Sequence, residues 1–192
     1  MFALKNKYYL YIENTKDLNL NLIKKRHKFS VIYRNTSKQE DLSKIMRFRQ
    51  ECKQRGVSFY FANNIKLSVK LKADGIYVSA HNKDLQVLNL KKINIKIIGS
   101  AHNLKEYSHK IKQGCEKIVI SRLFKTDYKK KNNFIGIIKF NSMILRLKKE
   151  LIPLGGIRLH NLNSMRIIRS KSFAILSCLL YTSDAADDSL RV

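Results

Sequence analysis

The sequence has little of what marks a disulfide-stabilised, zinc-binding or membrane-spanning protein. Its three cysteines, Cys52, Cys115 and Cys178, are odd in number and form no CxxC pair, which argues against a disulfide framework and a zinc site. No apolar run reaches the roughly 18 residues that a membrane span needs. The opening residues, MFALKNKYYLYIEN, show no hydrophobic segment followed by a small-residue cleavage site, so we expect no signal peptide. These absences favour a protein of the reducing cytoplasm with no membrane partner.

Acidic residues are also scarce, since 14 Asp and Glu stand against 39 Lys and Arg and give a net charge of +25. A basic field attracts polyanions, which raises the question of nucleic-acid binding. Lys outnumbers Arg by 28 to 11, a bias that an AT-rich genome writes into surface positions, and the basic residues are spread along the chain. No recognition module such as the RRM signature is present. We therefore expect no nucleic-acid partner.

The length of 192 residues and the hydrophobic content of 44% are typical of one globular domain. The final stretch, CLLYTSDAADDSLRV, carries three Asp and no Lys in a chain otherwise rich in Lys, and it resembles translated adapter sequence. We expect a single domain over residues 1–177 and a non-native or disordered tail over residues 178–192.

Eight short runs rich in β-branched and aromatic residues alternate with polar or amphipathic stretches. The runs cover residues 7–13, 29–35, 57–63, 75–80, 95–101, 116–121, 151–157 and 172–177. They are almost continuously apolar, as parallel strands covered by helices are. Eight strands with seven connections predict an α/β fold of the (β/α)8 TIM-barrel type, with the eighth helix missing or replaced by the foreign tail. The alternative is a doubly wound open sheet, although no G-x-G-x-x-G follows the first strand.

The clearest predicted helix is QEDLSKIMRFRQECKQRG, residues 39–56. It has acidic residues at its start, basic residues at its end and a terminal glycine. Five residues are phased to form a stripe on one side of this helix: Leu42, Ile45, Met46, Phe48 and Arg49.

In a barrel, functional side chains lie at the carboxyl ends of the strands. The fifth predicted strand ends in IIGSAHN, where Ser100 and His102 are two residues apart and would share one face of an extended chain. Histidine is suited to proton transfer near neutral pH, and the simpler alternative is a capping or merely exposed side chain. Asp84, after the fourth strand, is a carboxylate near this edge and gives thin support for a magnesium site.

Two further stretches suggest phosphate binding. In PLGGI, Gly155 and Gly156 end a strand and could expose backbone N–H groups to a phosphate, although a tight turn that needs glycine explains them equally well. In FKTDYKKK, Thr126 and Lys129 offer a hydroxyl and a mobile positive charge, unless this is only a solvated basic loop.

Taken in order, these motifs resemble the thiamine phosphate synthase/TenI family. VIYRN is similar to the family's Q-x-R-x-K segment, and FANNIKLSVKLKADGIYV to its third-to-fourth-strand stretch that ends in A-D-G-V-H. IIGSAHN is close to G-x-S-x-H, ISRLFKTDYK to G-x-x-F-x-T-x-x-K, and PLGGI to the A-x-G-G-I phosphate loop. The resemblance as a whole covers nearly all of the chain from Tyr8 to Ser177.

The resemblance implies that the partners are small molecules and assigns roles to individual residues. A synthase of this family joins a pyrimidine diphosphate to thiazole phosphate with Mg²⁺ and releases pyrophosphate, whereas the tautomerase branch shifts a double bond in thiazole phosphate by using a histidine. Arg34, Ser100 and Lys129 match positions on the pyrophosphate side. Thr126, Gly156 and Ser177 match positions that bind thiazole phosphate, and His102 matches the tautomerase histidine.

The chain departs from the family pattern at its metal positions. The first metal-binding Asp appears as Asn63 or Asn64, and the second falls on Asn82, or on Asp84 if two residues were inserted. Loss of carboxylates removes the charge that holds Mg²⁺ against a pyrophosphate leaving group. Three further departures lie outside the metal positions: the Gln and Lys of the second strand appear as Ile32 and Thr36, and the His of A-D-G-V-H as Tyr77.

We therefore expect a TenI-like barrel that binds thiazole phosphate, with Mg²⁺ needed only if synthase activity is retained. An active synthase and a catalytically inactive barrel that binds a phosphorylated metabolite are the alternatives, and a homo-oligomer is left open.

Overall fold

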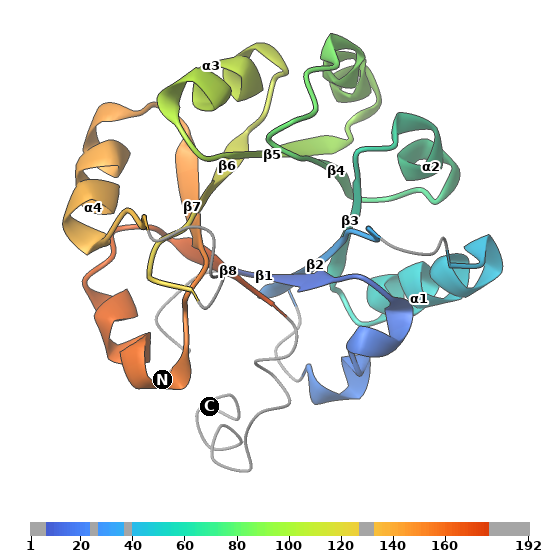
Figure 1. Ribbon diagram of the computed structural model, residues 1–192. Coiled ribbons are helices and arrows are strands. Elements are labelled where there is room, and N and C mark those ends of the chain that lie inside the picture. Colours follow the sequence, from blue (N-terminus) through green and yellow to red (C-terminus); the bar gives the residue numbers. More distant parts are fainter. Residues whose placement is uncertain (1–6, 24–26, 37–39, 127–132, 177–192) are drawn as a thin grey trace.

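The computed structural model describes residues 7–23, 27–36, 40–126 and 133–176, and in it eight parallel strands form a closed barrel (Figure 1). Neighbouring strands follow the order of the sequence, and β1 pairs with β8 to close the ring. The strands are β1 (Lys7–Ile12), β2 (Phe29–Tyr33), β3 (Ser58–Ala62), β4 (Gly75–Val78), β5 (Lys96–Ala101), β6 (Lys117–Ser121), β7 (Glu150–Leu154) and β8 (Ser172–Leu176). The predicted TIM barrel is confirmed, and closure of the ring excludes the open sheet.

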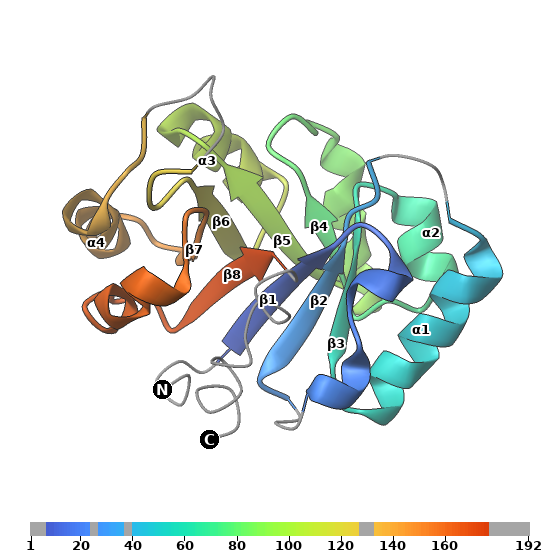
Figure 2. The same ribbon diagram turned by 60° about the horizontal axis from the view of Figure 1, so that its bottom comes forward.

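The helices lie on the outside of the ring of strands (Figures 1 and 2). The α-helices are α1 (Leu42–Gln54), α2 (Ile65–Lys70), α3 (Leu104–Lys112) and α4 (Ile137–Arg146). The 3₁₀ helices are η2 (Thr15–Asp17), η3 (Leu20–Leu22), η4 (Leu85–Ile93) and η5 (Leu159–Arg166). Across the described ranges, none of these helices is long and apolar enough to span a bilayer. Residues 177–192, which include the expected tail, lie outside the described residues.

Alternation along the strands produces two apolar clusters. One lies between the sheet and the helices, and the other fills the barrel. The barrel interior consists of Tyr9, Tyr11, Ile32, Tyr60, Tyr77, Ile98, Val119, Ile152 and Ala174. Tyrosine rings replace many of the branched aliphatic side chains usual in this place. Gly75 permits this arrangement, because an added Cβ would lie only 2.2 Å from the Tyr60 ring.

Helix α1 begins after Asp41, whose Oδ1 accepts the N–H of Ser43 at 3.1 Å. Its buried residues are Ile45, Phe48, Arg49 and Cys52, a spacing of three and four residues. Met46 is 48% exposed, so the predicted stripe was wrong at this position. Met46 follows Ile45 directly, and one residue turns an α-helix by about 100°, which carries Met46 off the buried side. Arg49 can be buried because its Nη2 donates to the carbonyl oxygen of Lys72 at 2.7 Å and pairs with Asp74 at 3.3 Å.

Candidate functional site

His102 lies directly after β5, at the carboxyl end of the barrel. Strand β5 stops at Ala101 because Asn103 caps α3, and the Asn103 Oδ1 accepts the N–H of Glu106 at 2.9 Å. In return, Glu106 Oε2 accepts the backbone N–H of His102 at 2.7 Å. This reciprocal pair fixes the backbone that carries the imidazole.

The His102 ring is held by a residue of the next strand. Its Nδ1 lies 2.8 Å from Oγ of Ser121, the last residue of β6. The His81 ring, from the loop after β4, lies 6.4 Å from the His102 ring between centroids. Since Ser121 engages Nδ1, Nε2 is the nitrogen that can face a bound molecule. His81 follows the fourth predicted strand, where polar residues were expected at the functional end of the barrel, whereas Ser121 was not singled out from the sequence.

Ser100 is buried within β5, whereas His102 is exposed after the end of the strand. Ser100 lies within β5, is 6% exposed and is adjacent to Val119 in the register of β5 and β6, which places it on the inward side with Ile98. The sequence predicts that both side chains share one face at the end of this strand. In the structure Ser100 lies inside the strand, near the carboxyl end of the barrel interior, and His102 is exposed beyond that end.

Asn63 joins the ends of β3 and β4. Its backbone has a φ of 58°, and its Oδ1 accepts the N–H of Ser79 at 2.8 Å and Nδ2–H of Asn82 at 3.4 Å. Asn64 has another task, because its Oδ1 accepts the N–H of Leu67 and caps α2. Of the two asparagines considered from the sequence, Asn63 is therefore the one whose side chain connects to the loop that carries His81.

The two glycines after β7 are required by backbone conformation and by a close contact. Gly155 and Gly156 have φ values of 97° and 69°, a region that favours glycine. An added Cβ on Gly156 would lie 2.5 Å from the carbonyl oxygen of Lys125, and the N–H of Phe124 donates to the carbonyl oxygen of Gly155 at 3.0 Å. The loops after β6 and β7 are thus packed together.

Thr126 lies in the loop after β6, where Arg122 Nη1 donates to its Oγ1 at 3.2 Å. The Arg122 side chain also lies against Gly155, with Cγ 3.2 Å from the position of an added Cβ. A guanidinium, a hydroxyl and a glycine turn therefore meet at one edge of the barrel, a combination suited to an anion. Lys129 and Ser177, the other predicted members of this group, lie outside the described residues.

Arg34 follows β2 directly and is exposed at the same end of the barrel. Burial raises the pKa of Tyr11 well above its ordinary value, the neighbouring Tyr77 raises it further, and the positive charge of Arg34 opposes this shift. The charge of Arg34 thus acts on Tyr11, inside the barrel near its carboxyl end.

A family model described as thiamine monophosphate synthase (TMP-TENI) matches residues 10–179. The chain belongs to this family. Its barrel thus has the fold and the family that the sequence motifs predicted.

Two thiamine-phosphate synthases are distantly similar to this chain. A thiamine-phosphate synthase of Prochlorococcus marinus (strain AS9601) is 25% identical over 161 residues, which are 83% of this chain and 46% of that protein. One from Clostridioides difficile (strain 630) is 26% identical over 158 residues, 81% of this chain and 74% of that protein. The chain spans about half the length of the Prochlorococcus relative.

Among solved structures, thiamine phosphate pyrophosphorylase from Pyrococcus furiosus superposes with a TM-score of 0.75 at 18% sequence identity, covering 100% of this chain and 96% of that chain. This similarity shows a shared fold.

The family implies a Mg²⁺ ion, and the side chains at the matching positions do not fit one. Asn63 and Asn82 offer neutral amide oxygens, and these already accept the N–H groups of Ser79 and Asp84 at 2.8 Å each. The Asp84 carboxylate caps η4 by accepting the N–H of Gln86 at 2.9 Å. Within the four described ranges, no three His, Cys, Asp or Glu side chains gather in a way that could hold a metal. Mg²⁺ prefers carboxylates and phosphates as protein and substrate ligands.

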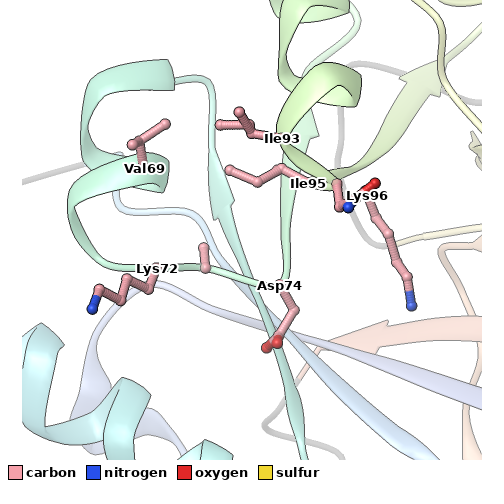
Figure 3. Close-up of a pocket in the computed structure, with 8 residues that line it drawn as sticks. Val69, Lys72, Asp74, Ile93, Ile95 and Lys96 are labelled. Carbon is pink, nitrogen blue, oxygen red and sulfur yellow. The ribbon is translucent and has the colours of Figure 1, made fainter.

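A pocket of about 430 Å³ opens at the opposite end of the barrel, between α2 and η4 (Figure 3). Val69, Ile93 and Ile95 gather there, while the charged ends of Lys72 and Lys96 point away in different directions (Figure 3). This pocket holds none of the predicted site residues and lacks convergent polar groups, so the candidate site remains the carboxyl end of the barrel.

Proposed function

We propose that this chain binds thiazole phosphate and transfers a proton on its ring, as a thiazole tautomerase does. The observation that carries the proposal is the His102 imidazole, oriented through Nδ1 by Ser121 at the carboxyl end of β5, beside neutral amides where a synthase needs carboxylates. A histidine positioned in this way performs general acid–base catalysis without a metal.

The proton step uses both forms of one imidazole. With Nδ1–H donated to the Ser121 hydroxyl, the neutral ring has a basic Nε2 that accepts a proton from a carbon of the bound ligand. The resulting imidazolium returns that proton to a second ligand atom, so the double bond shifts while charge and oxidation state are unchanged. Glu106 supports this step by holding the His102 backbone in place.

The phosphate of the ligand would be bound by the loops after β6 and β7, next to the strand end that carries Ser121. Arg122 supplies a guanidinium, Thr126 a hydroxyl, and the turn at Gly155 and Gly156 keeps the backbone close. Inward-facing Ser100 would contact the ring from below, and Arg34 adds a further positive charge at the rim. Because different side chains serve phosphate binding and proton transfer, we predict that the two can be disrupted independently.

The test is to incubate the chain with thiazole phosphate in D₂O and to follow loss of ring-adjacent proton signals by NMR. Exchange that is faster with protein than without it supports the proposal. Binding without exchange would instead indicate an inactive phosphometabolite-binding barrel.

The names of the curated relatives favour a second candidate, an active thiamine-phosphate synthase. Because Asn63, Asn82 and the capping Asp84 do not supply a magnesium site, we predict no Mg²⁺-dependent release of pyrophosphate from a pyrimidine diphosphate and thiazole phosphate above the rate without protein. A coupled pyrophosphate assay measures this, with added pyrophosphate as the control for the coupling enzymes. Robust turnover would establish the synthase and show that the phosphates of the substrates supply enough ligands.

A further inference from the structure

Lys110 is a fully buried ammonium at the back of the candidate site. Its side chain comes from α3 and is 0% exposed. Its Nζ donates three hydrogen bonds, to the carbonyl oxygens of Ser79 and Asn82 at 2.7 and 2.6 Å and to Gln113 Oε1 at 2.7 Å. All three acceptors are neutral.

Gln113 completes the same cluster from the end of α3. It is also 0% exposed, and its Nε2 donates to the carbonyl oxygens of Asn82 and Asp84 at 3.1 and 2.9 Å. Lys110 and Gln113 together bind three backbone carbonyls of the loop 79–84, which follows β4. We name this pair of side chains the α3 clamp.

The clamped loop carries groups that face the site. Ser79 and Asn82 donate to Asn63 Oδ1, and between them lies His81, whose ring is 6.4 Å from the His102 ring. The helix that carries the clamp also carries Glu106, which fixes the His102 backbone. A single helix thus sets both sides of the gap between the two imidazoles.

Burial of an ammonium among neutral carbonyls costs desolvation free energy, because its hydrogen-bond acceptors carry no opposite charge to compensate for the lost water. Desolvation lowers the pKa of Lys110, because burial disfavours its charged form. An apolar side chain of similar length would avoid that cost, and buried charges are retained in some proteins because they specify one geometry.

We propose that Lys110, with Gln113, is a positioning residue that holds the loop 79–84 so that His81 and Asn63 face His102 at the reacting ring. This inference rests on the proposed function, since it concerns the proton transfer assigned to His102. The clamp binds the loop 79–84, whereas the proposed phosphate groups come from the loops after β6 and β7, so its loss should affect proton transfer more than ligand affinity.

The experiment compares Lys110→Met and Gln113→Met with the parent. Lys112→Met serves as the matched control, because Lys112 lies on the same helix and is exposed. Three quantities are measured: the Kd for thiazole phosphate by calorimetry, the ring-proton exchange rate at saturating ligand, and the imidazole NMR signals of His81. We expect exchange to slow about tenfold or more in both clamp variants, because small misplacements of reacting groups are costly. We also expect the Kd to stay within a few-fold of the parent value, the His81 signals to shift, and Lys112→Met to behave as the parent.

Unchanged exchange together with unchanged His81 signals in folded variants would overturn the proposal. A parallel loss of affinity, exchange and Tm would also overturn it, because that pattern describes a purely structural residue. If Lys110→Met does not fold, Gln113→Met decides by the same criteria. If the parent shows no exchange, the proposed function fails separately, and the His81 signals alone decide whether the clamp sets the loop.

Discussion

At the scale of single residues, the proton transfer proposed for His102 depends on a hydroxyl from another strand. Ser121 Oγ lies 2.8 Å from Nδ1, which leaves Nε2 as the nitrogen that would act on the ligand in the proposed step. We predict that Ser121→Ala slows ring-proton exchange about tenfold, which lies below the 10²–10⁴-fold contribution of a complete general acid–base. Affinity for thiazole phosphate should stay within a few-fold, as measured by calorimetry.

Ser108→Ala is the control for Ser121→Ala, because Ser108 is exposed on α3 and its hydroxyl donates to the carbonyl oxygen of Leu104 within the same helix. Equal exchange rates in the Ser121→Ala variant and the parent would show that the hydroxyl does not orient the ring.

The motif IIGSAHN was sufficient to predict His102 at the carboxyl end of a strand, but it could not predict Ser121. The two residues are 19 positions apart, and they meet only through the register of β5 and β6, in which Ala101 is adjacent to Ile120. The burial of Lys110 could not be predicted for a different reason. A lysine on an amphipathic helix is normally solvated, and its burial here depends on carbonyls of a loop 28 to 31 residues earlier.

At the scale of elements, the turn after β7 is constrained by the loop after β6. A Cβ on Gly156 would lie 2.5 Å from Lys125 O and 2.7 Å from atoms of Phe124. We predict that Gly156→Ala displaces the 122–126 loop, destabilises the fold by about 1–3 kcal/mol through strain and steric overlap, and weakens binding of thiazole phosphate. Chemical denaturation and calorimetry measure the two effects.

Gly136→Ala is the matched control, since Gly136 also has a positive φ, 73°, but an added Cβ there has its nearest neighbour at 4.0 Å. This variant carries backbone strain without the overlap, and it should bind thiazole phosphate as the parent does. Equal ligand affinity in Gly156→Ala and the parent would remove the glycine turn from the phosphate site.

The strands were predictable because each is a short, nearly continuous apolar run, as expected for a sheet buried on both sides. The connections were less predictable. The segment after β4 forms the 3₁₀ helix η4, and Asp84, considered from the sequence as a metal ligand, is the N-cap of this helix. An Asp that follows a strand fits both roles, and the sequence alone does not show the contact with the N–H of Gln86 that makes Asp84 a cap.

At the scale of the whole molecule, the high positive charge produces repulsion between lysines at the starts of strands β1, β5 and β6. Lys7 is partly buried at the start of β1. Burial lowers its pKa from the ordinary value of 10.5, and the charges of Lys96 and Lys117 lower it further, against the opposing effect of Asp74 and Glu150. The folded state therefore carries a penalty while Lys7 is protonated.

We predict that Lys7→Met raises Tm at neutral pH, by an amount that corresponds to less than about 1 kcal/mol. Because the folded pKa is the lower one, the unfolded chain binds more protons between that value and 10.5, and the parent gains stability as pH rises through this window. The difference in Tm between variant and parent should shrink over the same window.

Thermal unfolding of parent and Lys7→Met across this pH range measures the effect. Lys70→Met, at an exposed position of α2, is the control and should show no such trend. A constant difference at all pH values would contradict a role for Lys7 protonation.

The central claim is that His102 transfers a proton on bound thiazole phosphate, and the most direct test is deuterium incorporation by NMR in parent and His102→Ala at saturating ligand. We predict that the variant retains the Kd of the parent within a few-fold and loses most of the exchange, about 10²-fold or more for a general acid–base. His160→Ala, at an exposed position of η5, should exchange as the parent does. If the parent exchanges and His102→Ala exchanges as fast, His102 is only an exposed side chain at the start of α3.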